Sequence, residues 1–92
     1  MFINKTKSGT NNICGEKIAA FRKAAGISQN RLAVLLQIRG LDVDKNAIQR
    51  IEAGKRFVID IELVYFTEIL SVTYEALLDR SQVPLVPTED IE

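Results

Sequence analysis

The 92-residue sequence contains no histidine and no tryptophan, and it has one cysteine and two prolines. Histidine and cysteine are the usual zinc ligands and a disulfide needs two thiols, so Cys14 alone provides neither a zinc site nor an internal crosslink. The longest apolar run is far shorter than the roughly 18 residues of a membrane-spanning helix. No apolar stretch of a secretory signal follows the lysines of the first 12 residues. We therefore expect a cytoplasmic protein without a membrane partner.

The sequence also offers little for catalysis. It has no glycine-rich phosphate loop and no pair of carboxylates on a predicted cleft, and without histidine it lacks an evident general base. A chain of 92 residues has room for one small core and hence for one main activity. We expect no enzymatic activity, no metal and no cofactor.

The formal net charge of zero hides a strong asymmetry along the chain. Residues 1–56 carry eleven Lys/Arg and four Asp/Glu, whereas residues 57–92 carry one and eight, which gives net charges of +7 and −7. A basic half on a neutral chain indicates a polyanionic partner, although charges that only solvate a surface can produce the same split.

Apolar residues recur at helical spacing along most of the chain, and no segment alternates as a strand would. The pattern predicts an all-α domain of five short helices. The first helix is expected from about residue 16 to 25, with Gly26 as its left-handed C-terminal cap. The second follows the N-cap Ser28 and runs to about Gln37, with its leucines facing inward: Leu32, Leu35 and Leu36.

The third helix is expected to begin after the N-cap Asp44, to bury Ile48 and Ile51, and to stop at Gly54. Its outer face then carries the polar residues of the segment, which are Lys45, Asn46, Gln49 and Arg50.

The fourth helix is expected to begin at the N-cap Asp60, with Ile59 and Val64 spaced as a hydrophobic staple. Thr73 is expected to cap a fifth helix that runs from Tyr74 to about Asp79.

This pattern divides the chain into three parts. Residues 1–14 are expected to form a flexible arm, residues 15–79 the helical domain, and residues 80–92 an extended acidic tail. The tail contains both prolines, and the sequence leaves open whether it is disordered or docks on a second subunit or another protein partner.

Two motifs identify a family. Gly-Ile-Ser-Gln-x-x-Leu-Ala opens the second predicted helix, and Ile-x-x-Ile-Glu-Ala-Gly-Lys closes the third. In this order, over about residues 16–78, they resemble the helix-turn-helix domains of the Cro and lambda-type phage repressors and the XRE-like bacterial regulators. The resemblance implies a five-helix lambda-repressor-like fold and a partner of double-stranded DNA.

The joint between the second and third helices departs from that pattern. Leu36 and Ile48 are twelve positions apart, which is longer than in most of the family and similar to a subset of it. We expect the second helix to continue to Arg39 and to end at Gly40, because glycine favours a left-handed cap. Leu41 and Val43 would then turn back under the third helix, which would explain why the joint is apolar.

By position in the family's motif, the residues that face the bases would be Lys45, Asn46, Ala47 and Arg50. Their chemistry suits the major groove, where Arg or Lys donates to guanine, Asn pairs with adenine and a methyl group contacts thymine. The alternative is a surface helix that simply keeps its polar residues outward.

The resemblance also assigns phosphate contacts and a scaffold. The phosphate candidates are Gln29, Asn30, Lys55 and Arg56, with Lys23, Arg31 and Arg39 as further ones; each could instead be an ordinary solvated side chain. Arg22 and Glu52 match a pair that in relatives forms a salt bridge between the first and third helices. If it is exposed, such a pair contributes only about 0–1 kcal/mol to the free energy of unfolding. We therefore expect its role to be fixing the angle of the third helix rather than stabilising the fold.

One helix reads only a few base pairs, so regulators of this type usually bind a two-fold site as homodimers. The acidic half supplies apolar candidates for an interface, some of which could equally be core: Tyr65, Tyr74, Leu77, Leu78, Val83, Leu85 and Val86. We predict a sequence-specific transcriptional regulator, in particular a repressor. The alternative is a protein-interaction module or antitoxin-like partner-binding protein that keeps the fold.

Overall fold

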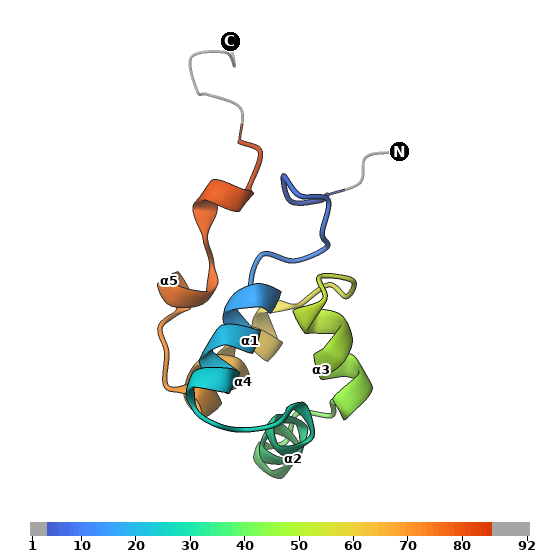
Figure 1. Cartoon of the computed structure of the whole chain (residues 1–92), viewed down its shortest axis with the longest axis vertical. Helices are drawn as coiled ribbons and strands as arrows, with labels where there is room; N and C mark the ends of the chain where they lie inside the picture. The colour runs from blue at the N-terminus through green and yellow to red at the C-terminus, as the bar shows by residue number, and fades with distance from the viewer. Residues whose placement is uncertain (1–3, 86–92) are drawn as a thin grey trace.

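The computed structural model describes residues 4–85, which form an all-helical domain without strands (Figure 1). The helices are α1 (Gly15–Ala24), α2 (Gln29–Arg39), α3 (Lys45–Glu52), α4 (Asp60–Leu70), α5 (Tyr74–Leu77) and the short 3-10 helix η1 (Arg80–Gln82). α1 contacts α3, α4 and α5, and α2 contacts α3 and α4. The predicted all-α class with five α-helices is confirmed. Within residues 4–85, no helix has the length and apolar character to cross a membrane.

Three helices begin at the capping residues that the sequence predicts. Ser28 Oγ accepts a hydrogen bond from the Arg31 amide at 3.0 Å, and Asp44 Oδ1 accepts one from the Ala47 amide at 2.8 Å. Thr73 Oγ1 accepts a third from Ala76 at 3.1 Å. Each cap satisfies one of the amide groups that have no partner in the first turn of a helix, which explains why α2, α3 and α5 begin where they do.

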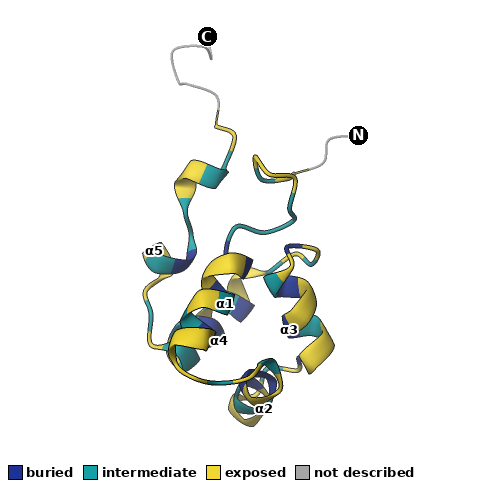
Figure 2. Cartoon of the chain, viewed as in Figure 1, coloured by how far each residue is buried: buried dark blue, intermediate teal, exposed yellow. Residues whose placement is uncertain are grey.

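The core lies between the inner faces of the helices (Figure 2). Phe66 of α4 is its largest fully buried side chain, and the isoleucines of α1 and α3 pack into the same cluster. Leu35 is only half-buried, although its spacing predicts an inward position. The buried apolar residues are Cys14, Ile18, Leu32, Ala33, Leu36, Val43, Ile48, Ile51, Phe66 and Leu77.

The long joint before α3 has the predicted conformation. α2 continues to Arg39, and Gly40 caps it with a left-handed φ of +109°. Val43 is buried and Leu41 packs against the core, so these two residues turn back toward the domain, whereas Ile38 is exposed. Gln37 Nε2 donates to the Val43 carbonyl at 2.6 Å and closes the joint.

The start of α4 differs from the prediction. Ile59, not Asp60, is the N-cap, and Asp60 is the first helical residue. The reason is Glu62, whose Oε1 accepts a hydrogen bond from the Ile59 amide at 3.1 Å and so caps the helix from its third position. The predicted staple is therefore also wrong, because Ile59 and Val64 are both exposed.

The fifth helix is shorter than predicted. α5 ends at Leu77, and Asp79, which was expected at its end, instead caps the 3-10 helix. Asp79 Oδ1 accepts from both the amide and the hydroxyl of Ser81, at 3.0 and 2.7 Å. Aspartate competes for nearby amide groups in this way, which makes it a poor residue for a helix interior. Residues 86–92 of the predicted tail lie outside the described residues.

The N-terminal segment is tied to the helical domain at Asn12. The Asn12 side chain donates to the carbonyls of Ile51 at 3.0 Å and Arg56 at 2.8 Å, and it accepts from the Gly15 amide at 2.8 Å. At Gly15 the backbone of α1 approaches α3 so closely that a Cβ atom would lie 2.1 Å from the Ile51 carbonyl oxygen. Asn12 and Gly15 thus hold the start of α1 against the end of α3.

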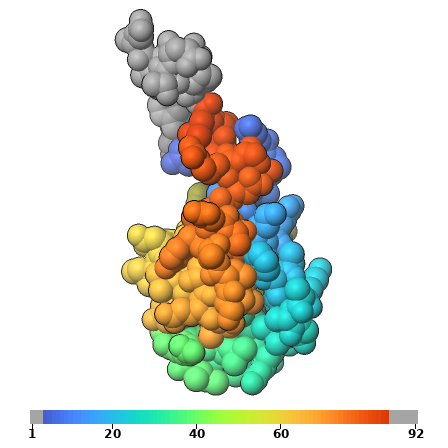
Figure 3. Space-filling model, turned by 90° about the vertical axis from the view of Figure 1, so that its left-hand side faces the viewer, coloured from blue at the N-terminus to red at the C-terminus, as the bar shows by residue number. Residues whose placement is uncertain are grey.

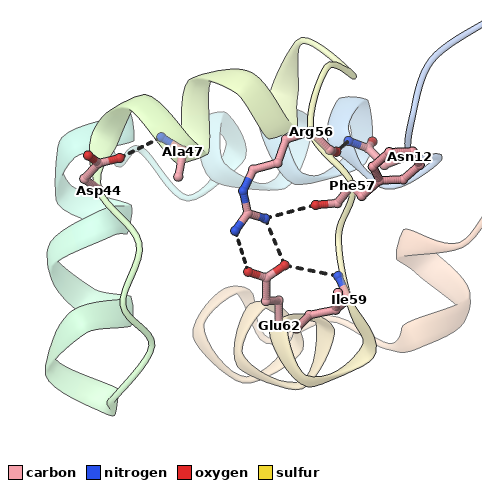
Figure 4. A network of polar contacts seen from close by, with 7 residues as sticks. All are labelled: Asn12, Asp44, Ala47, Arg56, Phe57, Ile59 and Glu62. Atoms are coloured by element: carbon pink, nitrogen blue, oxygen red, sulfur yellow. Dashed lines mark hydrogen bonds and ion pairs between the residues drawn. The ribbon is translucent and has the colours of Figure 1, made fainter.

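A second network holds the loop between α3 and α4 (Figure 4). Arg56 donates to both carboxylate oxygens of Glu62, at 2.9 and 2.7 Å, and to the Phe57 carbonyl at 3.0 Å. The Glu62 side chain is only 7% exposed. The Arg56 hydrogen bonds, opposed by burial and assisted by the Ile59 amide, lower the pKa of Glu62 below its ordinary value.

This network predicts an acid-sensitive contribution to stability. Because the pKa of Glu62 is lower in the folded protein than in the unfolded chain, the ionised carboxylate stabilises the fold above its ordinary pKa, about 4.3. That stabilisation disappears as the pH falls further, through the folded pKa. We expect Glu62→Gln to lower the free energy of unfolding at pH 7 by about 1–3 kcal/mol, and by less at pH 3, in urea titrations.

Glu68→Gln is the matched control. Its ion pair with Arg39 is 3.5 Å long and more than half exposed at both side chains, so the change is expected to stay within about 0.5 kcal/mol at both pH values. This role of the buried carboxylate would be contradicted if both variants lost the same free energy of unfolding. It would also be contradicted if the loss in Glu62→Gln were the same at pH 7 and pH 3.

Candidate nucleic-acid interface

The outer face of α3 is polar and open to solvent. Ile48 and Ile51 anchor the helix in the core with no exposed surface, whereas the four polar side chains on its other side are exposed: Lys45, Asn46, Gln49 and Arg50. Spacings of three and four residues place side chains on one face of a helix. The same periodicity that buries the isoleucines therefore presents this polar row.

Part of that row forms a shallow hollow with the residues that follow α3. Its lining residues are Asn46, Gln49, Arg50, Ala53 and Lys55. The structure thus brings together three of the predicted contact residues, Asn46, Arg50 and Lys55. Gln49 also lines the hollow, although its position in the family's motif does not assign it a contact. It lies three residues after Asn46 and four before Ala53, and this helical spacing could have predicted that the three share one face.

The other two predicted base-facing residues lie outside the hollow. Lys45 is exposed in the first turn of α3. Ala47 is half-buried and packs against the core, so only part of its methyl group is accessible. Ala47 also provides the amide that Asp44 caps, which makes its backbone part of the start of the helix.

Arg22 and Glu52 form the ion pair that the resemblance suggests, and they form it in the interior. Arg22 Nε lies 2.7 Å from Glu52 Oε2 and Arg22 Nη2 lies 3.0 Å from Glu52 Oε1. Their side chains are 10% and 8% exposed, so the value for an exposed pair does not apply. Arg22 Nη1 also donates to the Ile27 carbonyl at 2.9 Å. One guanidinium therefore connects α1 with the turn before α2 and with the end of α3.

Gln29 belongs to the same network. Its side-chain amide donates to Glu52 Oε1 at 2.9 Å, which ties the first residue of α2 to the last residue of α3. Gln29, which the sequence predicts to contact a phosphate, is thus held by the buried carboxylate of Glu52. Its neighbours Asn30 and Arg31 are exposed in the first turn of α2.

Arg56 does not sit as a free phosphate ligand. Its guanidinium is turned toward Glu62 and its charge is paired there, with the side chain 31% exposed (Figure 4). The pairing raises the pKa of Arg56, chiefly through its hydrogen bonds to Glu62. The geometry shows that Arg56 supports the loop, and its phosphate contact stays a prediction. The adjacent Lys55 is exposed.

The charge around the hollow is unbalanced. Among the salt bridges of residues 4–85, none involves Lys45, Arg50 or Lys55. Glu52, at the end of α3, is paired with Arg22, whereas Asp44 caps the start of α3 and keeps its charge there beside Lys45. Within the described residues no group of three or more His, Cys, Asp or Glu side chains could hold a metal ion. The arrangement suits an anionic polymer.

Comparison with known proteins gives one informative likeness. No family model matches the chain, and no curated protein sequence matches it significantly. Among solved structures, the restriction-modification controller protein C.AhdI from Aeromonas hydrophila is similar, with 25% sequence identity and a TM-score of 0.61. The match covers 70% of this chain and 89% of that protein. Together with the motifs of α2 and α3, it identifies the chain as similar to the helix-turn-helix regulators of the Cro and lambda-repressor type.

Proposed function

We propose that this protein is a sequence-specific DNA-binding transcriptional regulator, acting as a repressor, that reads the major groove with α3. The observation that carries the proposal is the outer face of α3, where exposed polar and basic side chains, which have no ion-pair partner among residues 4–85, surround a shallow hollow. An α-helix fits the major groove and presents its outer side chains to the base edges. The likeness to a controller protein of a restriction-modification system supports a regulatory role.

In this proposal the residues at the start and middle of α3 read the bases. Arg50 donates to guanine, Asn46 pairs with adenine, and Lys45 donates to guanine or to a neighbouring acceptor. The accessible part of the Ala47 methyl group contacts thymine. Gln49 lies in the same hollow and can pair with adenine as Asn46 does.

Affinity comes mainly from phosphate contacts on both sides of α3. Lys55 provides one at the end of α3. Asn30 and the amide groups at the start of α2 provide the other, with Gln29 oriented by its bond to Glu52. Arg56 contributes indirectly, because it holds the loop that carries Lys55.

Selection of random duplex oligonucleotides by the purified protein tests the function directly. We expect recovery of a two-fold symmetric site with half-sites about 34 Å apart, one turn of the double helix, or a multiple of it. Binding that ignores sequence would contradict the proposal. Failure to bind any duplex would instead favour a protein-interaction module on the same fold.

Two substitutions separate base reading from phosphate contact. Arg50→Ala is expected to weaken the free energy of binding to the selected site by about 1–3 kcal/mol and to relax the base preference at one position. Lys55→Ala is expected to weaken binding to all sequences and to reduce the slope of log K against log salt by about 1. Both are measured by fluorescence anisotropy at several salt concentrations. If both variants bind the selected site as the parent does, these residue roles are wrong.

We also propose that the regulator is a homodimer whose interface lies on α4 and the loop before it. Four large apolar side chains are exposed within eight residues there: Phe57, Ile59, Ile61 and Val64. Such a cluster is unusual on a monomer surface and is typical of an interaction site. Of the residues first considered for the interface, Leu77 is buried and Leu78 packs against the core, whereas Tyr74 and Leu85 are exposed.

The dimer surface is tested by Ile61→Asp. Ile61 is 60% exposed, so a charge there leaves the fold intact but opposes a helix–helix contact. We expect sedimentation equilibrium to show a shift toward monomer, and binding to the two-fold site to fall by about tenfold or more, which corresponds to at least 1.4 kcal/mol. Tyr74→Asp on α5 is the matched control and should leave both measurements unchanged. If Tyr74→Asp shifts the protein toward monomer and Ile61→Asp does not, the interface lies on α5 instead.

A further inference from the structure

The N-terminal segment carries a lysine that the structure holds beside the loop after α3. Lys5 Nζ donates to Asn11 Oδ1 at 2.8 Å. Asn11 in turn donates from its side chain to the Lys55 carbonyl at 2.9 Å and from its backbone to the Gly54 carbonyl at 2.7 Å. The ammonium group of Lys5 is thus connected through a single side chain to the backbone of Lys55.

Close packing fixes this arrangement. Thr10 lies over Gly54, where a Cβ atom would come within 2.6 Å of Thr10 Cγ2 and where φ is +76°. The Thr10 hydroxyl is itself bound to the Asn12 carbonyl at 2.9 Å. Residues 10–12 therefore lie against the end of α3, and the chain before them extends away from that helix (Figure 1). The segment thus lies next to the backbone of Lys55.

The other side of the segment is unsuited to an anion. Thr6, Ser8, Asn12, Glu16 and Glu52 line a polar pocket between the segment, the start of α1 and the end of α3. It contains two carboxylates, of which Glu52 is paired with Arg22. Beyond the pocket the segment meets η1, where the Lys7 amide donates to the Gln82 carbonyl at 2.9 Å, and Figure 3 shows both segments at the same end of the molecule. The carboxylate of Glu16 disfavours a phosphate group in this pocket.

We propose that residues 4–12 are part of the nucleic-acid interface, with Lys5 contacting the same phosphate backbone as Lys55. The inference rests on the proposed function and adds a residue that neither the motif nor the likeness assigns. The phosphates of a DNA strand are closely spaced, so lysines on two neighbouring segments can contact one strand. Because Asn11 already holds the Lys5 ammonium group, less side-chain freedom is lost when it binds.

The test measures the salt dependence of binding by the full chain to its selected duplex, for the parent and for Lys5→Gln. We expect Lys5→Gln to bind more weakly on every sequence and to reduce the slope of log K against log salt by about 0.9, the value for one phosphate contact on duplex DNA. Lys5→Arg keeps the charge and should retain the parental slope. Thermal melting in the absence of DNA should be the same for all three proteins.

Lys17→Gln provides the control for a general loss of charge. Lys17 is exposed on α1, near Asp79 rather than Lys55, and its replacement should leave the slope unchanged. A parental slope in Lys5→Gln, or an equal reduction in Lys17→Gln, would overturn the inference while the proposed function stands. A parent that binds no duplex would overturn the proposed function, and the inference with it.

Discussion

The buried ion pair between Arg22 and Glu52 is the contact on which the arrangement of the helices depends. It joins α1 to α3 directly, and through Ile27 and Gln29 it also holds the turn and the start of α2. Taking two charges out of water is costly, so a buried pair is weak support for stability as such, yet removing one partner costs about 3–5 kcal/mol. Such a pair favours one orientation of the helices over others, and the angle of α3 is the property that a reading helix needs.

The loop after α3 repeats this design with Arg56 and Glu62. In both networks the carboxylate is inside and the arginine satisfies it, so neither acidic group adds negative charge to the outer face of α3. Asn12 completes the support, because it binds the carbonyls of Ile51 and Arg56 on either side of that loop. Each buried pair is neutral, so the basic character of this half of the chain comes from the excess of Lys and Arg in residues 1–56.

Local chemistry made much of the fold predictable. Ser28, Asp44 and Thr73 cap helices because a short side-chain oxygen reaches an amide group three residues later. Gly40 ends α2 because glycine accepts a positive φ. The start of α4 could not be predicted in this way, since Glu62 caps it from within the helix and is itself held by Arg56.

The sequence by itself determined the helical class, most of the helix ends and the polar outer face of α3, because each depends on residues within one or two turns of one another. It also offered the Arg22–Glu52 pair, but only through resemblance to a family. The tertiary structure alone decided that this pair is buried and that Asn11 and Asn12 bind the end of α3 and the loop after it. These features join residues up to 44 positions apart, and no local preference specifies which distant group a side chain will meet.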